Sequence, residues 1–517
     1  MLADQSSSPG EVKPAGAAAR PLGLRLTEAL FETDEAGESD LARFLACDDA
    51  AEALSLWYGE RLEPLLTRGG AGLRASIDRD IAAIDEMLSA QVETILHHSD
   101  FQTLEASWLG LDQLLDAAGA DERIVVRILS ATWAEIGRDF NRAAEFDRSL
   151  LFERLYSDEF GMPGGLPYGL VLCDYEIQHR HGTRSGAAAD DISTLSSLAG
   201  VAAAAFAPCI IGASPALLGV EDFSELSFAQ DIGLPFRGAD YARWRALQAR
   251  DDSRFLAVTA PRVLMRRRHA EDGTRAEPFR FEEGRRGLGI DDWLFGNAVY
   301  AFGAVVIQAF RDWSWFADIR GTRQDESGAG LVENMPIAPF STGEARAYRR
   351  PLEVELTDRK QKQMEEIGLM ALSPCRYTPN SAFLGAPSLH APAAGGGTDA
   401  RGANERISAM LQYILCVSRF AHYIKVIARD AMGAFTTAEE LQTRLSSWLQ
   451  QYVTGNSDAP DELKAQYPLN SSSVEIRELP GKPGSFACVM QLKPHFQIDQ
   501  MVASFRLHTE LSGLRVR

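Results

Sequence analysis

Two histidines, His179 and His181, lie just after a predicted strand, and Asp174 and Glu176 precede them. Imidazole and carboxylate groups are common ligands of zinc and other divalent metals, so these residue types could form a metal site. Arg180 places a cation between the two imidazoles, however, and the sequence from His181 onward is typical of a solvent-exposed loop. We therefore expect no metal here.

Two acidic pairs, Glu282-Glu283 and Asp291-Asp292, could serve general acid–base catalysis, which needs two carboxylates with separated pKa values in a cleft. The same stretch is rich in arginine, namely Arg266, Arg267, Arg268, Arg280, Arg285 and Arg286. This density of arginine favours ion-pair networks over catalysis.

The sequence contains none of the common catalytic motifs. The phosphate-binding P-loop, the HExxH zinc motif, the GxSxG nucleophile elbow and the protein-kinase signatures do not occur in it. The glycine clusters at 69–72 and 328–330 lack the strand-to-helix context of a dinucleotide site and are interpreted as loops. We predict a protein that is not an enzyme, with no catalytic residue, no bound metal and no cofactor.

A basic stripe on a long predicted helix could bind a partner. Ser418, His422, Lys425 and Arg429 follow each other at spacings of four, three and four, so they share one face of the helix. Such a stripe needs either solvent or acidic groups around it. It is therefore a solvated face, or a contact surface for an acidic partner or a neighbouring domain.

Composition restricts the class of protein. The chain has 517 residues, of which 45% are hydrophobic and 24% charged, as in ordinary globular proteins. Its net charge of −20 argues against a non-specific nucleic-acid binder, which would need a basic surface. The first twenty residues lack the apolar core of a secretory signal, and no apolar run approaches the length of a membrane span.

The cysteines indicate a reducing compartment. The six cysteines form no CxxC pair, and most of them lie in apolar runs, as buried thiols do. They are Cys47, Cys173, Cys209, Cys375, Cys416 and Cys488. We therefore expect a soluble cytoplasmic protein without insertion into a membrane.

The N-terminal part, residues 1–70, is predicted to be a flexible tail followed by a linker arm. Its first twenty residues are rich in Ser, Pro, Gly and Ala and cannot build a core. Leu22, Leu24 and Leu26 then alternate with other residues, which fits a loose strand seeking a sheet edge and equally the first turn of a helix. The acidic stretch 32–40 separates this arm from the rest.

A helical hairpin is predicted for residues 71–120. The first helix carries an apolar stripe at helical spacing, made of Ile77, Ile81, Ile84, Leu88, Val92 and Ile95. Ser99 and Gln102 form a capping box at the start of the second helix. The apolar face of that helix is predicted to consist of Phe101, Leu104, Trp108, Leu111 and Leu115.

Residues 121–400 are predicted to form an α/β body, because strands alternate there with helices. The expected strands are 123–129, 168–175, 254–260 and 351–356. The expected helices include 201–206, 297–313 and 360–367, and the last of these is capped by Thr357 or Asp358. A loop rich in Gly, Ala and Pro follows at 385–402.

The C-terminal part, residues 401–517, is predicted to be α+β. A long helix at 406–434 precedes a capping box formed by Thr437 and Glu440. Three short strands follow, with the shared-face positions Val474 and Ile476, then Phe486, Cys488, Met490 and Leu492, then Met501, Ala503, Phe505 and Leu507. Such a small sheet is marginal alone, so the rest of the chain or another chain must cover its edges.

Short stretches along nearly the whole chain resemble one family, the large subunit of the contractile sheath of bacterial type VI secretion systems, a TssC/VipB family related to phage tail sheaths. The stretches are 84–89, 101–108, 164–169, 174–176, 207–215, 252–255, 296–302, 318–321, 411–415, 419–423, 480–484 and 493–496. The first seventy residues and the segment 267–276 match weakly, and Phe206 and Cys209 depart from the pattern.

The resemblance implies a structural role. Large subunits of this family pair with a small sheath subunit and with other large subunits, and the heterodimers stack as six-protomer rings into a helical sheath around an inner tube protein. The assembly starts on a baseplate, lies in the bacterial cytoplasm and is anchored at the membrane. Its contraction drives the tube and spike into a target cell, and a recycling ATPase acts through the small subunit.

The resemblance also implies how subunits join, namely by β-augmentation, in which an extended segment adds to the edge of a neighbour's sheet. Carried onto this sequence, the strand donor is the arm with Leu22, Leu24 and Leu26. The strand acceptor consists of Val474, Ile476, Phe486, Cys488, Met490, Leu492, Phe505 and Leu507. His422, Lys425 and Arg429 remain a candidate contact stripe.

The expected fold is thus mixed, α+β and α/β, and tail-sheath-like. It has an N-terminal helical region, an α/β body and a C-terminal part that ends in an antiparallel β segment with an exposed edge. Two other functions stay open at this point. One is a paralogous large subunit that modifies a sheath, and the other is an α/β enzyme without a recognisable motif that uses Asp174 or Glu176.

Overall fold

The computed structural model gives a chain that divides into two compact units. The described residues are 41–162, 164–180, 190–270, 279–284, 293–323, 327–341, 346–376, 378–391, 408–432, 437–456, 459–478, 485–495 and 505–512. The first unit consists of residues 1–101 and 268–292, and the second of 102–267 and 293–517. The boundary at residue 101 lies within the segment 71–120, so the two helices predicted as a hairpin belong to different units.

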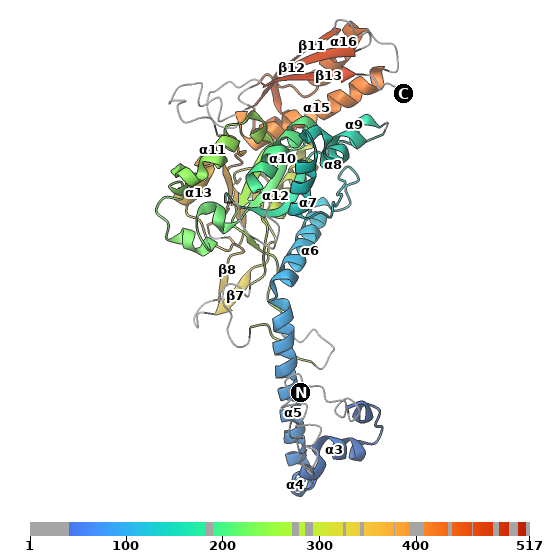
Figure 1. The fold of residues 1–517 in the computed structure, drawn as a ribbon, viewed down its shortest axis with the longest axis vertical. Coiled ribbons are helices and arrows are strands. Elements are labelled where there is room, and N and C mark those ends of the chain that lie inside the picture. Colours follow the sequence, from blue (N-terminus) through green and yellow to red (C-terminus); the bar gives the residue numbers. More distant parts are fainter. Residues whose placement is uncertain are drawn as a thin grey trace, which may run out of the picture. The chain divides into compact units, whose positions relative to one another are not determined.

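The first unit is helical (Figure 1). Its elements are α3 (Ala50–Tyr58), η1 (Gly59–Arg61), α4 (Leu62–Thr67) and α5 (Gly69–Leu96). The Trp57 indole N–H donates to the Asp80 carboxylate over 2.9 Å and ties α3 to α5. The predicted stripe on α5 is only partly used within the unit, because Ile81, Leu88 and Ile95 remain exposed.

The buried carboxylate Glu283 and its neighbour Gly284 join the segment 279–284 to the C-terminal end of α5. Glu283 accepts a hydrogen bond from the His269 backbone N–H over 2.9 Å, and its Oε1 lies 3.2 Å from His97 Nε2. Its neighbour Gly284 donates its N–H to Glu93 on α5 over 2.8 Å. Glu283 thus belongs to an ion-pair and hydrogen-bond network, as predicted for this acidic pair, although its partners shown here are His97 and the His269 backbone, whereas the prediction rested on the nearby arginines.

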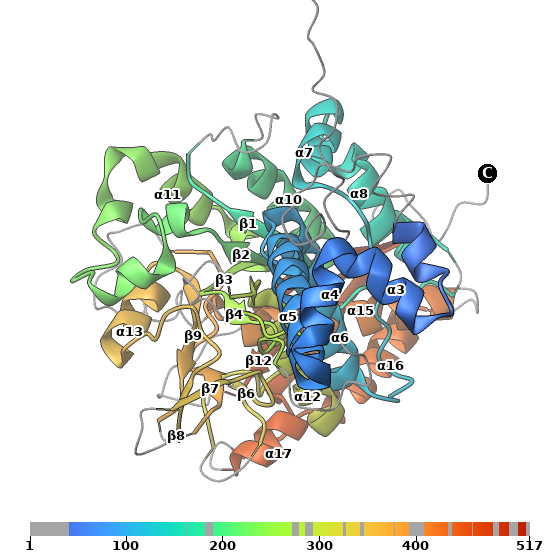
Figure 2. The same cartoon turned by 90° about the horizontal axis from the view of Figure 1, so that it is seen from below.

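A six-stranded mixed sheet forms the centre of the second unit. Its strands are β1 (Val171–Ile177), β2 (Cys209–Ala213), β3 (Leu256–Ala260), β9 (Leu369–Pro374), β10 (Ser381–Phe383) and β6 (Leu331–Val332), in that order across the sheet. Figure 2 shows β1, β2, β3 and β9 side by side in this order. These four are parallel, whereas β9, β10 and β6 are antiparallel.

Helices cover both faces of this sheet, which is why β2 and β3 are buried at every position and read as continuous apolar runs. Alternate residues point to opposite faces. Ile211 and Val258 pack with α10 (Asp191–Ala205), while Ile210 and Ala257 pack with α12 (Val299–Trp313). The predicted α/β body is therefore confirmed in its central sheet.

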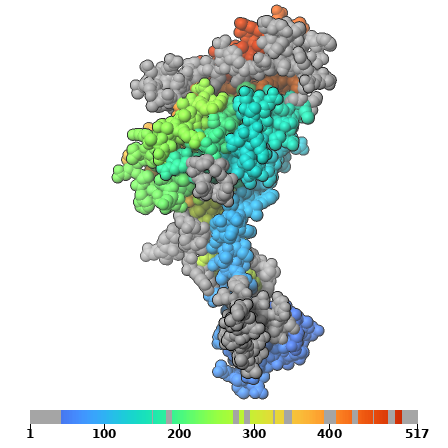
Figure 3. Space-filling model, in the orientation of Figure 1, coloured from blue at the N-terminus to red at the C-terminus, as the bar shows by residue number. Residues whose placement is uncertain are grey.

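The other helices and strands of the second unit surround this sheet, apart from three C-terminal strands described below. They are α6 (Ser99–Ala118), α7 (Trp133–Arg142), η2 (Phe146–Arg148), α8 (Leu150–Phe152), η3 (Glu153–Ser157), α9 (Asp158–Gly161), η4 (Pro215–Leu218), η5 (Phe223–Ser227), η6 (Pro235–Arg237), η7 (Ala239–Tyr241), α11 (Ala242–Gln248), η8 (Asp251–Phe255), β4 (Val263–Leu264), β5 (Phe295–Gly296), β7 (Ala338–Ser341), β8 (Arg346–Arg349), α13 (Asp358–Glu366), α15 (Leu411–Met432), α16 (Ala438–Gln450) and α17 (Asp461–Gln466). In the space-filling view, the residues of α7 to α9 (cyan) and of α10 to α11 (green) form one continuous surface (Figure 3).

Two predicted strands are wrong. Arg123 lies in a turn, residues 124–129 have no regular secondary structure and pair with no strand among the described residues, and Val125, Ile128 and Leu129 are exposed. Residues 351–356 form only an isolated bridge, between Leu352 and Val263. The residue types of both segments favour strands, but a strand also needs a partner edge. Residues 123–129 have none among the described residues, and residues 351–356 meet β4 only around this bridge, where Leu264 donates to the Pro351 carbonyl and Glu353 to the Arg262 carbonyl.

The packing of α6 is the reverse of the predicted one. Small residues and one leucine face the core, spaced four apart: Ala106, Gly110, Leu114 and Ala118. A Cβ on Gly110 would lie 2.3 Å from the Tyr300 ring of α12, so only glycine permits this close helix approach. The face with Leu104, Trp108 and Leu115 is exposed instead, and Trp108 is 62% exposed.

An ion cluster links η5, β1 and the segment after β8. Arg262 makes a bidentate pair with Glu176, with 2.5 and 2.7 Å between donor and acceptor atoms, and its Nη1 lies 3.6 Å from Glu353 Oε1. Burial raises the pKa of Glu353 to about 8, opposed by Arg262 and reinforced by the Asp222 and Glu176 carboxylates.

This pKa predicts a pH dependence of stability. Because the pKa of Glu353 is higher in the folded than in the unfolded state, its favourable contribution is complete below about pH 4.5 and is lost as the pH rises through about 8. Urea denaturation at pH 6 and pH 8 measures this effect in the parent and in Glu353→Gln. We expect the free energy of unfolding to fall between these pH values by about 2 kcal/mol more in the parent than in the variant. Parallel pH profiles of the two proteins would contradict this prediction.

Candidate inter-subunit surface

The C-terminal segment folds into the predicted three-stranded antiparallel sheet. Its strands are β11 (Leu469–Glu478), β12 (Ser485–Pro494) and β13 (Phe505–Ser512), in chain order across the sheet. The alternating apolar positions share one face, because Val474 pairs with Met490 and Ile476 with Cys488. That face is buried against α15 and α16, so the chain's own helices cover one side of the sheet (Figure 1).

The predicted capping box is present at the start of α16. The Thr437 side chain accepts the Glu440 backbone N–H, and the Glu440 side chain accepts the Thr437 backbone N–H. The capped helix then packs Leu441, Leu445 and Leu449 against the buried face of the sheet. This local signal therefore positions the helix that supports the strands.

The predicted acceptor residues lie on three strands, and these strands differ in whether an added strand can pair with them. Val474 and Ile476 belong to β11, and Phe505 and Leu507 belong to β13. The other four, Phe486, Cys488, Met490 and Leu492, belong to β12. Since β12 is paired on both sides, it cannot receive another strand, and only the outer edges of β11 and β13 remain.

The outer edge of β11 is partly occupied by the chain itself. Gln442 of α16 accepts the backbone N–H of Ile476 over 3.0 Å. At the start of the strand, Leu469 donates to the Tyr452 carbonyl and accepts the Thr454 N–H over 3.2 and 2.9 Å. A strand that joined β11 would have to displace these hydrogen bonds.

The outer edge of β13 carries no strand among the described residues. In an antiparallel pair, successive residues point their backbone groups alternately toward and away from the partner. The Ile476 N–H points away from β12, so its partner Cys488 directs its backbone groups toward Thr509 of β13. The outward N–H groups of β13 are therefore those of Arg506, His508 and Glu510.

The predicted donor, with Leu22, Leu24 and Leu26, lies outside the described residues. It stays a prediction.

The basic stripe of α15 does not form a free surface. Ser418 and His422 are buried, and Lys425 and Arg429 are half-buried. His422 Nε2 lies 3.0 Å from the Ala205 carbonyl oxygen, and burial lowers the pKa of His422 to about 4, so it is neutral and donates this N–H. Of the predicted alternatives, the solvated face is therefore wrong and the contact with a neighbouring domain fits, because His422, Lys425 and Arg429 contact η3, the segment around α9 and the end of α10 in the same unit.

Lys425 lies in an aromatic cage. Its Nζ is 5.0, 4.8 and 4.6 Å from the ring centroids of Tyr156, Phe160 and Phe206. Burial lowers the pKa of Lys425 to about 8, whereas the ring faces attract the ammonium. Next to the cage, Arg429 donates to the Met162 carbonyl over 3.2 Å. The stripe therefore attaches α15 to η3, α9 and α10, and α15 in turn packs against the C-terminal sheet.

The residues proposed for enzymatic chemistry have structural partners. Asp174 accepts hydrogen bonds from Ser107 over 2.5 Å and from the Tyr300 hydroxyl over 2.9 Å, and Glu176 is held by Arg262. No group of three or more His, Cys, Asp or Glu residues suited to a metal occurs in the described parts of the chain. His181 lies outside them. Among the described helices, none is long and apolar enough to cross a membrane.

Sequence reasoning missed two features of this surface. One is the exposed apolar face of α6, because periodicity alone does not say whether the large or the small residues face the core. The small residues spaced four apart, from Ala106 to Ala118, were the available signal. The other is the edge contact of Gln442, for which the sequence carries no signal.

Comparisons with known proteins agree with this architecture. Residues 78–390 match the family model described as "EvpB/VC_A0108, tail sheath N-terminal domain", and residues 400–511 match "EvpB/VC_A0108, tail sheath gpW/gp25-like domain". The chain is 34% identical over 444 residues to the type VI secretion system sheath protein TssC1 of Pseudomonas aeruginosa, which covers 85% of this chain and 86% of that protein.

A solved structure also shows a distant similarity. It is the cryo-EM structure of the anti-feeding prophage baseplate, 6-fold symmetrised, at 9% identity and a TM-score of 0.34, covering 74% of this chain and 81% of that chain. A likeness at this level carries no argument about function.

Proposed function

The chain belongs to the VipB/EvpB tail sheath family and is a structural sheath protein of the type VI secretion type, and from this premise we propose that it pairs with a small sheath subunit and polymerises around an inner tube protein. The polymer contracts and propels tube and spike into a target cell. It works in the bacterial cytoplasm, on a baseplate anchored at the membrane, and a recycling ATPase reaches it through the small subunit.

The observation that carries the proposal is the open edge of β13. A sheet edge presents unpaired N–H and C=O groups that can pair with another chain. Here one face of the sheet is buried by α15 and α16 and the edge of β11 is partly occupied, so within the described part of the chain the edge of β13 is the one left for a neighbour's strand. We propose that the arm with Leu22, Leu24 and Leu26 of another copy, or a strand of the small subunit, joins β13 there.

The exposed apolar groups support an additional protein contact. Leu104, Trp108 and Leu115 on α6, together with Val125 and the residues around it, leave large apolar side chains uncovered. Large exposed apolar patches mark protein interaction sites. We propose that the small subunit covers them in the heterodimer. The family is structural, so the enzymatic alternative is not retained.

Co-expression with the small-subunit gene tests the proposed function. We expect hollow, regular cylinders in negative-stain electron microscopy and a 1:1 heterodimer in the unassembled fraction. A soluble monomer that never forms cylinders would overturn the proposal. If deletion of the chain's gene in the bacterium left cylinders intact, the chain would be a modifying paralogue and not the main wall subunit.

Deletion of residues 1–31 is expected to leave the heterodimer intact but to block assembly or contraction, because it removes the proposed strand donor. Size-exclusion chromatography measures the heterodimer, and electron microscopy measures the cylinders. Deletion of residues 1–20 keeps Leu22, Leu24 and Leu26 and is the matched control, for which normal contractile cylinders are expected. Contractile cylinders from the longer deletion would show that the arm is not the donor.

A further inference from the structure

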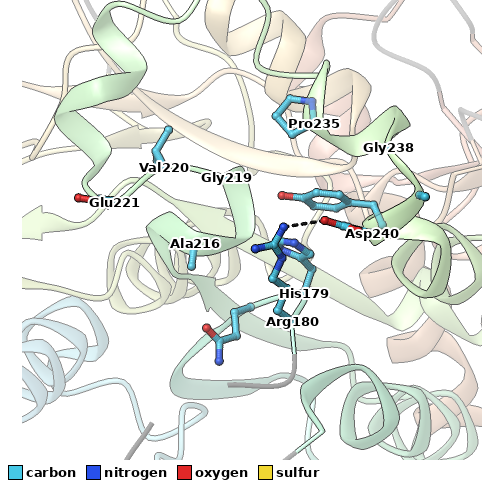
Figure 4. A pocket seen from close by; sticks show the side chains of 12 residues that line it. His179, Arg180, Ala216, Gly219, Val220, Glu221, Pro235, Gly238 and Asp240 are labelled. Atoms are coloured by element: carbon cyan, nitrogen blue, oxygen red, sulfur yellow. Dashed lines mark hydrogen bonds and ion pairs between the residues drawn. The ribbon is translucent and has the colours of Figure 1, made fainter. Parts of the chain in front are cut away.

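The second unit contains a cavity and a cage of aromatic rings, and the two differ in whether the chain itself satisfies their charged groups. The cavity, of about 550 Å³, opens beside the carboxyl ends of β1 and β2 (Figure 4). At its wall Arg180 pairs with Asp240 at 2.6 Å, and Glu221 is exposed to solvent. These charges are satisfied without a ligand, whereas the ammonium of Lys425 in its cage is not.

The ammonium of Lys425 has ring faces around it and, in the part of the chain that the structure describes, no hydrogen-bond acceptor and no ion-pair partner. An ammonium carries three N–H donors. Burial lowers the pKa of Lys425 to about 8, because the rings replace the water around these donors only in part. His422, about one turn earlier on α15, is neutral and donates to the Ala205 carbonyl instead. The cage therefore suits a cation without N–H groups better than a bare ammonium.

Two uncommon backbone conformations bring rings to Lys425. Residues 153–157 form a π-turn, which is frequent at functional sites, and Tyr156 lies on it. Phe206 follows the last turn of α10 with a φ of 53°, in the left-handed region that bulky residues rarely adopt. Such strained conformations cluster at binding and active sites, where the surrounding structure holds them. The local structure of the cage is thus that of a binding site.

The distances in the cage fit a methylated ammonium. A methyl carbon lies about 1.5 Å from its nitrogen and contacts a ring at about 3.5 Å, so a methylated nitrogen lies about 5 Å from a ring centroid. Lys425 Nζ lies 5.0, 4.8 and 4.6 Å from the centroids of Tyr156, Phe160 and Phe206. Aromatic cages recognise quaternary ammonium groups and methylated lysine. We propose that Lys425 is N-methylated and that the cage holds the methylated ammonium.

The modification needs a sulfonium methyl donor and a methyltransferase. The lone pair of the neutral Lys425 amine attacks the methyl carbon, an N–C bond forms, and the S–C bond breaks with its electron pair left on sulfur as a thioether. The new ammonium loses a proton to water before the next transfer. Because three rings lie around Nζ in the folded chain, the transfer precedes the packing of α15 on η3 and α10. Each methyl group replaces an N–H group, so the desolvation cost falls and the charge is kept.

Mass spectrometry of the chain purified from the bacterium that encodes it tests the modification. After digestion with a protease that does not cut at lysine, the peptide with Lys425 is expected to be heavier by one, two or three methyl groups. Growth on methionine with a deuterated methyl group should carry the deuterium into this peptide, since methionine supplies sulfonium methyl donors. The exposed Lys362 is the control and is expected to be unmodified. An unmodified or acetylated Lys425 would overturn the proposal.

Binding to the emptied cage tests its preference for methylated cations. In the full chain with Lys425→Ala, calorimetry is expected to show that choline binds about tenfold more tightly than 3,3-dimethylbutan-1-ol, which has the same shape without the charge. Phe206→Leu in the same background removes one ring and should weaken choline binding about fivefold.

Equal binding of choline and the alcohol, or full choline binding without the Phe206 ring, would overturn the cage. The mass measurement uses the unaltered chain, so it does not depend on the folding of the alanine variant. Neither measurement requires cylinders, so failure of the methylation proposal and failure of the sheath proposal are distinct.

Discussion

Replacing His508 with proline is expected to abolish cylinder formation while leaving the heterodimer folded. The pairing register directs the His508 N–H outward from β13, so proline removes a donor from the open edge and not from the β12–β13 ladder. Proline is tolerated on edge strands for this reason, but it blocks pairing with an added strand. The measurement is the number of cylinders seen by negative-stain microscopy, with the melting temperature of the heterodimer beside it.

Two further variants make this test specific. His508→Ala keeps the N–H and is expected to assemble normally, which separates the backbone from the side chain. Thr509→Pro removes an N–H that points toward Cys488 of β12, so it should lower the melting temperature of the heterodimer. Normal cylinders from His508→Pro would show that partners do not join this edge, and attention would then turn to β11, where Gln442 would have to be displaced.

Replacing Lys425 with glutamate is expected to lower the free energy of unfolding by about 3 kcal/mol. The carboxylate would take the position of the ammonium against the faces of Tyr156, Phe160 and Phe206. Ring faces carry partial negative charge, so they repel a carboxylate, and its desolvation is not compensated. Urea denaturation measures the effect. The C-terminal sheet should become susceptible to proteolysis first, because α15 holds it on the body.

Lys425→Met is the matched control, since methionine has a similar length and no charge. It is expected to stay within about 1 kcal/mol of the parent, because the lost cation–π attraction and the lost desolvation cost offset each other. The pKa of about 8 gives a second readout. Folding lowers the pKa of Lys425 from about 10.5 to about 8, so protonation in this range favours the unfolded chain. As the pH falls from about 10.5 to about 8, the free energy of unfolding of the parent should therefore decrease. The methionine variant lacks this titrating group and should not show this decrease. Equal stability of the glutamate and methionine variants would contradict the cage.

Lys425→Glu and His508→Pro change different contacts. Lys425 ties α15 to η3 and α9 within one chain, whereas β13 carries the edge proposed for a neighbour's strand. The first variant should therefore destabilise the chain itself and the second only the polymer.

The local sequence patterns predicted several elements correctly. The alternation from Val474 onward predicted the C-terminal strands, and the Thr437–Glu440 capping box predicted the start of α16. The apolar runs predicted β3 and α12, and the short family stretches predicted the tail sheath family that the comparisons show. These signals are short-range: side-chain periodicity and caps act within a few residues, so they can be recognised without knowing the rest of the fold.

Only the tertiary structure decided which faces and edges are used. The sequence predicted an inward face of Leu104 and Trp108, but Gly110 lets α6 approach Tyr300 on the opposite side. It predicted a strand at 123–129 for which no partner edge exists among the described residues. It left open whether the basic stripe faces solvent, a partner or a neighbouring domain, and only the structure shows that three rings from distant segments enclose Lys425. Burial and strand pairing depend on groups far apart in the chain, and a local pattern holds no information about which of them will meet.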